Sequence, residues 1–291
     1  MENFDYLRPK TLGEAYAALG NGKTTLMLAG GTDVIVQLRE ERKHCDQLID
    51  LKFIPEMMAL ELAADGSLLI GAAVACARIY EDPAIARAFP GVLDSAHIIG
   101  GIQIQSRASL GGNLCNASPA ADSAPALIAL GARLVIGSAS GTREVAVEDF
   151  FTGPGRNALG ANEMLLQIRI PALRKNENSF YLRFIPRNEM DIAVASAGAK
   201  LQLDASGENV ESARISLGAV AATPLLVTAA GAAIVGKPAN EATFKLAGEA
   251  AAEAATPITD MRGSIAQRKR LASVLTVRAL NGALQRIKEA R

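Results

Sequence analysis

The 291-residue sequence predicts an α+β fold in two domains. Short apolar runs typical of strands are interspersed with segments of helical periodicity, and helices dominate after residue 220. A polar stretch at residues 174–179 separates the two halves. We therefore expect one domain over residues 1–173, itself two α+β subdomains divided near residue 55, and a second over residues 174–291.

The composition is that of an ordinary globular protein. With 49% hydrophobic and 21% charged residues, disorder is excluded as the main state. Lys+Arg and Asp+Glu both number 30, so net charge gives no argument for nucleic acid or an anionic membrane. There is no run of 18 apolar residues and no signal-peptide pattern at the N-terminus. We expect a cytoplasmic protein without a membrane span.

The cysteines do not form a metal motif. Cys45, Cys76 and Cys115 contain no C-x-x-C pair, and only His44 and His97 could add imidazole ligands. Neither a zinc site nor an iron–sulfur site can be assembled from this set. We therefore expect no metal site in this chain.

The first elements are short and well bounded. Thr11 and Glu14 form a capping-box pattern, and Gly20 ends the helix that follows. Asp65 and Gly66 form a turn dipeptide between two apolar runs. The predicted elements are a helix over residues 12–19, a strand over 25–29, a helix over 34–39, a strand over 48–50 and a hairpin over 59–75.

Proline, glycine and capping residues also mark the elements predicted after residue 75. Pro83 and Pro90 mark two helix starts. Residues 109–119 look too polar and glycine-rich for a helix or strand, so an irregular segment is expected. Asp122 can cap a helix that Gly131 ends. The remaining predicted elements are a hairpin of residues 133–136 and 143–147, strands at 164–170, 180–184, 193–203 and 210–219, and helices at 225–233, 240–255 and 264–290.

Two glycine-rich segments carry the candidate chemistry, at residues 29–33 and at residues 108–113 continuing to Asp122. Paired glycines permit positive φ and carry no Cβ, so successive backbone N–H groups can converge on an anion. A helix start directly after the first segment adds partial positive charge. Together the segments could hold the two phosphates of a dinucleotide. Each alone also fits an ordinary tight turn.

These segments resemble the FAD-binding medium subunit of the molybdenum hydroxylases, the family of xanthine dehydrogenase, carbon monoxide dehydrogenase, nicotinate dehydrogenase and 4-hydroxybenzoyl-CoA reductase. The matching residues are 26–36 and 106–122, with weaker matches at 164–171 and 183–193. The resemblance implies a FAD-binding domain of the vanillyl-alcohol-oxidase (PCMH) type. A smaller α+β domain of the carbon monoxide dehydrogenase flavoprotein type would follow.

The resemblance also implies which residues bind FAD. Those expected along the stretch from adenine to pyrophosphate are Met27, Leu28, Ala29, Gly30, Gly31, Thr32, Asp33 and Val34. Those expected on the opposite side are Ala108, Ser109, Gly112, Asn113, Asn116, Ala121 and Asp122, the last on a ribitol or ribose hydroxyl. Those expected near the flavin ring are Ile99, Gly100, Ile104, Leu165 or Leu166, and Arg183.

Several of these residues have a structural reading beside the functional one. Asp33 would repel pyrophosphate, so its side chain is expected to cap the following helix. Asp122 fits an N-cap as well as a ligand contact, and Asn113 fits a bond to its own loop. Arg183 fits a surface ion pair. Ile99 stands where some relatives place an aromatic ring, so stacking on the flavin is not implied.

Covalent and cluster-bearing variants of the family are disfavoured. His44 and His97 match no cofactor motif, so the expected FAD is non-covalent. Cys115 lies inside the second motif but needs no redox role, because it is also a small packing side chain. The reductase branch with an additional four-iron cluster needs an inserted cysteine-bearing segment, which this sequence lacks.

The implied function is electron transfer within a complex. A large molybdenum-cofactor subunit would hydroxylate the substrate, and a small two-iron two-sulfur subunit would pass electrons to this chain. The chain would deliver them to NAD or another acceptor, in a heterotrimer or its dimer, with no catalytic residue of its own. The rival readings are a stand-alone flavin-dependent oxidoreductase of the same fold and a non-redox nucleotide-binding module. The substrate and the acceptor stay open.

Overall fold

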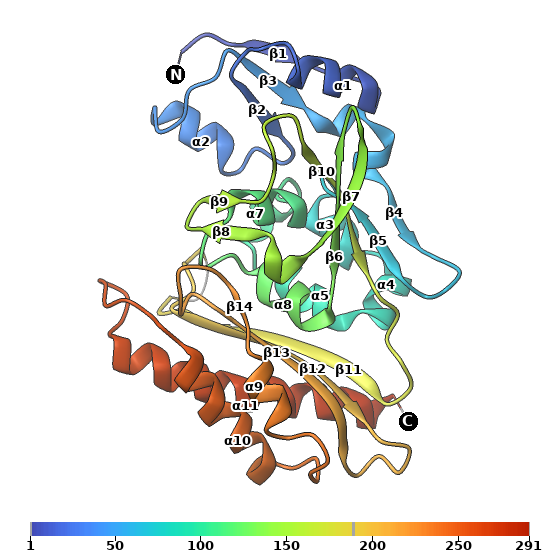
Figure 1. Ribbon diagram of the computed structural model, residues 1–291, viewed down its shortest axis with the longest axis vertical. Helices are drawn as coiled ribbons and strands as arrows, with labels where there is room; N and C mark the ends of the chain where they lie inside the picture. Colours follow the sequence, from blue (N-terminus) through green and yellow to red (C-terminus); the bar gives the residue numbers. More distant parts are fainter. Residues whose placement is uncertain (1, 188–189, 291) are drawn as a thin grey trace.

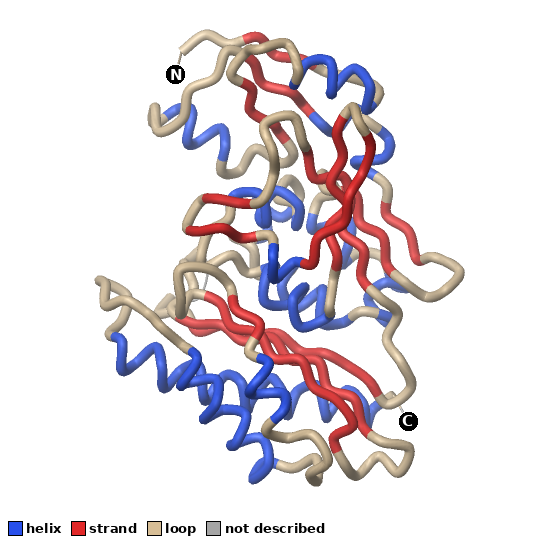
Figure 2. Tube along the Cα trace, viewed as in Figure 1, coloured by secondary structure: helices blue, strands red, loops and turns tan. Residues whose placement is uncertain are grey.

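Three principal sheets follow one another along the long axis of the molecule (Figure 1), in a computed structural model that describes residues 2–187 and 190–290. A parallel sheet lies at the N-terminal end, a five-stranded antiparallel sheet in the middle and a four-stranded antiparallel sheet at the C-terminal end. Figure 2 shows the C-terminal helices gathered on one side of the last sheet. The fold is α+β, as predicted.

The N-terminal sheet has the strand order β1-β3-β2. Its strands are β1 (Asp5–Leu7), β2 (Thr25–Leu28) and β3 (Gln47–Asp50), and its helices are α1 (Leu12–Leu19) and α2 (Val34–Arg39). Because β2 and β3 are parallel neighbours, the segments that leave their carboxyl ends emerge at the same edge of the sheet. This edge becomes one wall of the site described below.

The middle sheet has the order β4-β5-β10-β6-β7. Its strands are β4 (Leu60–Leu62), β5 (Leu68–Gly71), β6 (Arg133–Ser138), β7 (Gly141–Ala146) and β10 (Met164–Ile170). The helices between β5 and β6 are α3 (Cys76–Tyr80), α4 (Pro83–Ala88), α5 (Pro90–Ala96), α6 (Ile102–Gln105), α7 (Leu110–Asn116) and α8 (Ser123–Leu130). Short 3₁₀ turns at Leu51–Phe53, Pro55–Met58 and Val147–Asp149, and a small hairpin of β8 (Phe151–Gly153) and β9 (Arg156–Asn157), complete this part.

The C-terminal sheet lies between two layers of helices (Figure 1). Its strands are β11 (Glu177–Phe184), β12 (Ala195–Leu203), β13 (Val210–Gly218) and β14 (Leu225–Leu226), and its helices are α9 (Thr228–Ala232), α10 (Glu241–Ala254) and α11 (Ile265–Glu289). Helices α11 and α9 pack on one face, with α10 packed against both of them, and α5 and α8 pack on the other face. A Cβ on Gly198 would lie 2.6 Å from the Pro125 carbonyl oxygen, so β12 and α8 approach closely.

Most predicted elements are confirmed. Thr11 caps α1 by accepting the Glu14 N–H, and Gly20 ends that helix. Pro83 and Pro90 occupy first-turn positions of α4 and α5. The predicted hairpins, the strand at 164–170 and the long C-terminal helix are all present, with ends shifted by a few residues.

Three expectations about the elements after residue 105 are wrong. Residues 110–116 form helix α7, because Ser109 caps it and Gly111 allows it to pack on the backbone of Ala72. Asp122 precedes α8 but makes no side-chain cap bond, since its carboxylate is bound by residues of β11. The segment predicted as a helix from residue 225 begins with strand β14, and only residues 228–232 are helical.

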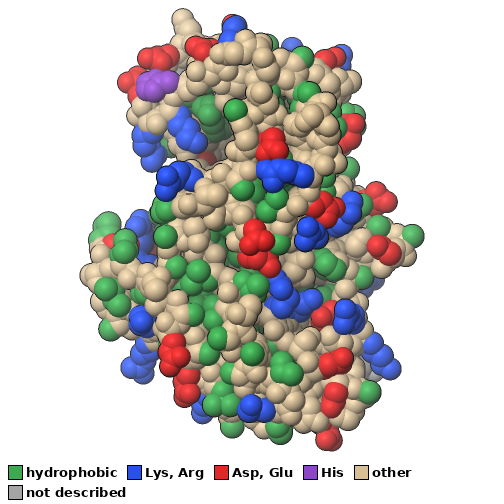
Figure 3. Space-filling model, in the orientation of Figure 1, with side chains coloured by type: hydrophobic (Ala, Val, Ile, Leu, Met, Phe, Trp, Pro, Cys, Tyr) green, Lys and Arg blue, Asp and Glu red, His purple; other side chains and the backbone are tan. Residues whose placement is uncertain are grey.

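The surface carries both signs of charge. Figure 3 shows basic and acidic side chains interspersed over one face, in keeping with 30 residues of each sign. Within the residues that the structure describes, no helix is both long and apolar enough to cross a bilayer.

Candidate functional site

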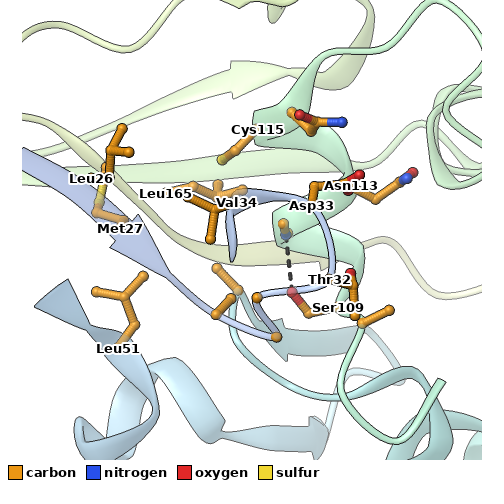
Figure 4. Close-up of a pocket in the computed structure, with 18 of the residues that line it drawn as sticks. Leu26, Met27, Thr32, Asp33, Val34, Leu51, Ser109, Asn113, Cys115 and Leu165 are labelled. Carbon is orange, nitrogen blue, oxygen red and sulfur yellow. Dashed lines mark hydrogen bonds between the residues drawn. The ribbon is translucent and has the colours of Figure 1, made fainter. Parts of the chain in front are cut away.

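A cavity of about 300 Å³ lies between the carboxyl end of β2 and helix α7, within the size range of small-molecule sites. Figure 4 shows Met27 and Leu51 at one end and Thr32, Ser109 and Asn113 at the other. The lining is therefore apolar on one side and polar on the other. Such a cavity suits a ligand that combines a flat apolar ring with a polar chain.

Both glycine-rich segments contribute to the lining. The predicted residues that line the cavity are Met27, Ala29, Gly30, Gly31, Thr32, Asp33, Val34, Ile99, Ala108, Ser109, Gly112, Asn113, Asn116 and Leu165. Segments about 80 residues apart in sequence thus meet across one space. The predicted residues outside the lining are Leu28, Gly100, Ile104, Ala121, Asp122, Leu166 and Arg183.

The first segment is a turn that only glycine fits. A Cβ on Gly30 would lie 1.9 Å from the carbonyl oxygen of Arg107, so the two segments touch through their backbones. Gly31 has φ +82°, which L side chains rarely adopt. Within the described chain, the N–H groups of Gly31 and Thr32 donate to no protein acceptor. Both residues line the cavity, so these unpaired N–H groups are candidates for binding an anion there.

A partly buried network of Lys52, Asp50 and Tyr6 supports this turn. The Lys52 ammonium donates to the Ala29 carbonyl oxygen at 2.7 Å and to Asp50 Oδ1 at 2.6 Å. Tyr6 donates its hydroxyl to Asp50 Oδ2 at 2.5 Å. Burial raises the pKa of Asp50, but the bonds from Lys52 and Tyr6 outweigh burial and hold that pKa below its usual range. The network therefore keeps a carboxylate and an ammonium beside the turn.

The second segment is helical. Ser109 Oγ accepts the Gly112 N–H at 3.0 Å, the bond drawn in Figure 4. A Cβ on Gly111 would lie 2.4 Å from the Ala72 carbonyl oxygen, whereas one on Gly112 would meet only Ser109 Oγ at 3.0 Å and Ala29 at 3.9 Å. Gly111 is thus needed for packing. Gly112 leaves room on the cavity side.

Amide side chains fix the walls of the cavity. Asn116 Oδ1 accepts a hydrogen bond from the Gln37 side chain at 3.0 Å, which links α7 to α2. Asn113 Oδ1 accepts the N–H and hydroxyl of Ser123 at 3.2 and 2.6 Å. Asn157 donates to the Cys115 carbonyl oxygen at 2.8 Å. Asn113 therefore bonds the start of α8, rather than the backbone of its own loop.

Asp33 does not cap α2, contrary to the expectation. Its backbone is helical, with φ −104° and ψ −51°, and its carboxylate makes no cap bond. The side chain instead lines the cavity (Figure 4). Burial raises its pKa, against the opposing influence of Lys43 and Arg42.

Asp122 and Arg183 bind each other. Arg183 Nη1 lies 2.5 Å from Asp122 Oδ2, and Tyr181 donates its hydroxyl to Asp122 Oδ1 at 2.9 Å. Both charged side chains are largely buried, so this is no surface ion pair. Burial raises the pKa of Asp122 to about 6, against the lowering effect of Arg183 and Tyr181. The cluster joins the start of α8 to β11.

The other predicted residues outside the lining have packing roles. Leu28 and Ala121 are buried in hydrophobic clusters. Gly100 has φ +63° and lies against Ile104. Leu166 is also buried, and only its neighbour Leu165 lines the cavity. Residues 188 and 189, within the weaker match at 183–193, lie outside the described residues.

Both histidines lie outside the cavity, and one of the three cysteines lines it. His44 lies 2.9 Å from Glu2, and His97 packs edge-on against Tyr80, both outside the lining. Cys115 lines the cavity, but burial raises the pKa of its thiol to about 12, so it is a thiol at neutral pH. Among the described residues no group of three or more His, Cys, Asp or Glu side chains could hold a metal ion.

Sequence reasoning missed several residues on other elements. Lys43, Gln37 and Asn157 line the cavity, Lys52 holds the glycine turn, and Tyr181 binds Asp122 outside the lining. Two signals could have found some of them. Lys52 follows β3 just as the glycine turn follows β2, at the shared edge of parallel strands. Tyr181 lies two residues before Arg183, on the same face of β11.

The residues present fit a dinucleotide with an aromatic ring system. The unpaired N–H groups of Gly31 and Thr32 suit a diphosphate, and the space beside Gly112 admits one close to the backbone. Ile99 and Leu165 offer apolar surface for a ring. The FAD site expected from the resemblance is therefore compatible with the cavity.

Comparisons with known proteins agree over the whole chain. The FAD binding domain in molybdopterin dehydrogenase matches residues 2–173, and the CO dehydrogenase flavoprotein C-terminal domain matches residues 180–283. The xanthine dehydrogenase FAD-binding subunit of Escherichia coli O157:H7 is 31% identical over 280 residues, covering 96% of this chain and 95% of the relative.

Solved structures give the same result. Carbon monoxide dehydrogenase from Hydrogenophaga pseudoflava, in a form lacking the Mo-pyranopterin moiety, has a chain that superposes with TM-score 0.93 at 30% identity, covering 98% of both chains. Quinoline 2-oxidoreductase from Pseudomonas putida 86 gives 0.89 at 30% identity, again over 98% of both. The chain belongs to the family of FAD-binding subunits of the molybdenum hydroxylases, which includes the xanthine and carbon monoxide dehydrogenases.

Proposed function

We propose that this chain is the electron-relay subunit of a multi-subunit molybdenum hydroxylase. It would receive electrons from iron–sulfur clusters of a small partner subunit and pass them to NAD or another acceptor. The observation that carries the proposal is the cavity lined by both FAD motifs, in a chain matched over 98% of its length by a carbon monoxide dehydrogenase chain. Bound FAD supplies electron exchange both singly and in pairs.

The residues of this chain bind and orient the cofactor. The N–H groups of Gly31 and Thr32 would hold the diphosphate from one side, and the start of α7 at Ser109 would face it from the other. Ile99 and Leu165 would exclude water from the ring. We assign no proton transfer and no catalytic acid or base to the chain.

We propose that the FAD is held without a covalent bond. His44 and His97 lie outside the cavity. Among the described residues, the two sulfur atoms in its lining belong to the thioether of Met27 and to the thiol of Cys115, whose pKa burial raises to about 12. A cytoplasmic location is proposed because Cys45, Cys76 and Cys115 are free thiols.

We propose the domain division at residues 1–173 and 174–291. One hydrophobic cluster contains residues between Ala15 and Ile170, and another contains residues between Ala195 and Ile287, which supports the division. A further division near residue 55 would separate the parallel sheet from the middle sheet.

The proposed complex contains a large molybdenum-cofactor subunit and a small two-iron two-sulfur subunit, as a heterotrimer or its dimer. Similar chains come from enzymes named for xanthine, carbon monoxide and quinoline. Because chains about equally similar to this one come from enzymes named for such different substrates, we infer that the substrate would be bound by another subunit.

Purification from the native cell tests the proposal. The chain should co-purify with molybdenum and iron, and the complex should hydroxylate a substrate while reducing an acceptor. The chain alone, loaded with FAD, should exchange electrons with artificial dyes and with NADH but should hydroxylate nothing. Full hydroxylation by the chain alone would favour the stand-alone oxidoreductase. Recovery of a metal-free monomer from native extract would contradict the relay role.

A further inference from the structure

Few charged side chains line the cavity that would hold the FAD diphosphate. Among the described residues that line it, the charged side chains are Asp33 and Lys43. The diphosphate of FAD would bring two negative charges beside the carboxylate of Asp33. Backbone N–H groups provide partial positive charge, but a full cation in the lining comes only from Lys43, within the part of the chain that the structure describes.

The chain is folded so that Lys43 returns to the cavity. Helix α2 ends at Arg39, and Glu41 adopts φ +57°, which reverses the backbone. The Gln37 carbonyl oxygen then accepts the N–H groups of Arg42 at 2.9 Å and Lys43 at 3.3 Å. Gln37 itself lines the cavity and bonds Asn116 across it. Lys43 is thus tethered to the wall of the cavity, with its side chain exposed at the rim.

Arg42 provides a natural comparison. It carries the same charge one residue earlier, and both cations lower the pKa of Asp33 against burial, which raises it. Arg42 pairs with Glu40 and does not line the cavity. Both side chains therefore act on Asp33 in the same direction, but only Lys43 lines the cavity where a ligand would bind.

We propose that Lys43 is the counter-ion of the FAD diphosphate, a binding residue outside both FAD motifs that makes affinity depend on the phosphates rather than on the flavin ring. This inference rests on the proposed FAD site. A charge-assisted contact of this kind should change affinity by about tenfold. Because Lys43 is exposed at the rim, salt should weaken the contact.

The test is equilibrium binding to flavin-depleted full-length chain. FAD, ADP and riboflavin are titrated into wild type, Lys43→Met, Lys43→Arg and the matched control Arg42→Met, by flavin fluorescence or calorimetry. We expect Lys43→Met to weaken FAD and ADP by about tenfold and to leave riboflavin unchanged. Lys43→Arg should keep most of the affinity, and Arg42→Met should change it by less than about twofold. FAD binding should fall more steeply with salt in wild type than in Lys43→Met.

Several outcomes would overturn the inference. If Lys43→Met and Arg42→Met lost FAD affinity equally, the effect would come from general electrostatics rather than from a contact. If Lys43→Met lost affinity for riboflavin as much as for FAD, the substitution would have damaged the fold. If Lys43→Met had no effect in an Asp33→Asn background, Lys43 would act only by neutralising Asp33. Wild-type chain that bound no FAD would instead contradict the FAD site itself, so the two failures are distinguishable.

Discussion

At the scale of single residues, the glycines of the two motifs differ in what they do. Gly30 is required by a carbonyl oxygen of Arg107, and Gly31 by its positive φ. In helix α7, a Cβ on Gly112 would meet no backbone but would lie 3.0 Å from Ser109 Oγ. The sequence could predict these positions because glycine pairs are conspicuous. It could not predict the reason at Gly30, because that contact spans 77 residues of chain.

Replacing Gly30 and Gly112 by alanine should separate these roles. The added Cβ in Gly30→Ala would push the glycine turn away from the backbone of Arg107. This should lower the free energy of unfolding by about 2–3 kcal/mol. Gly112→Ala should change it by less than about 1 kcal/mol, because alanine favours the helix, while still weakening FAD binding. Urea unfolding of the flavin-depleted chain and FAD titration measure both. If the Gly30→Ala chain were as stable as wild type, the close backbone contact between Gly30 and Arg107 would be contradicted.

The network behind the first turn gives a second residue-scale prediction. Lys52→Met removes the support of the Ala29 carbonyl and leaves the buried Asp50 without its cation, so unfolding should become easier by about 2–3 kcal/mol. FAD affinity should also fall, because the turn relaxes. Lys23→Met is the matched control, since Lys23 pairs with Asp5 in solvent and its loss should have no measurable effect. Equal stability of the two variants would refute the supporting role.

At the scale of elements, the least predictable part was helix α7. Its sequence has two adjacent glycines and two asparagines, which disfavour an isolated helix. Packing of Gly111 on Ala72 and the cap from Ser109 outweigh that preference. The hairpins and the helices that begin with proline were predictable because their signals are local. A helix made by tertiary contact has no local signal.

The junction of α8 and β11 predicts a pH dependence. Because burial raises the pKa of Asp122 to about 6 in the folded chain, the folded state holds this proton more strongly than the unfolded state, where the pKa is about 4. Asp122 therefore favours folding at low pH, and this contribution falls as pH rises from about 4 to about 6.

Asp122→Asn lacks that titration, so it isolates the effect. The unfolding free energy of wild type minus that of Asp122→Asn should decrease between pH 4.5 and pH 7, as measured by denaturant unfolding. A difference that rises with pH would mean that Arg183 and Tyr181 dominate burial and hold the pKa of Asp122 low.

At the scale of the whole molecule, the resemblance predicted the family and the order of its parts, and the comparisons confirm the family over nearly the full chain. The resemblance also predicted most residues of the cavity lining, because most of them lie in the two continuous motifs at residues 26–36 and 106–122. Lys52 and Tyr181 escaped because they act from other elements: Lys52 holds the glycine turn from the 3₁₀ turn after β3, and Tyr181 binds Asp122 from β11, outside the cavity lining. Such partners become visible only when the tertiary contacts are known.

The most direct test of the central claim is the identity of the flavin that the purified chain carries. The protein is precipitated with acid or heat, and the supernatant and pellet are analysed by chromatography and mass spectrometry. The cavity between β2 and α7 predicts about one FAD per chain, all of it in the supernatant. FMN in the supernatant, flavin bound to the washed and fully denatured pellet, or a chain that neither carries nor takes up FAD would contradict the account.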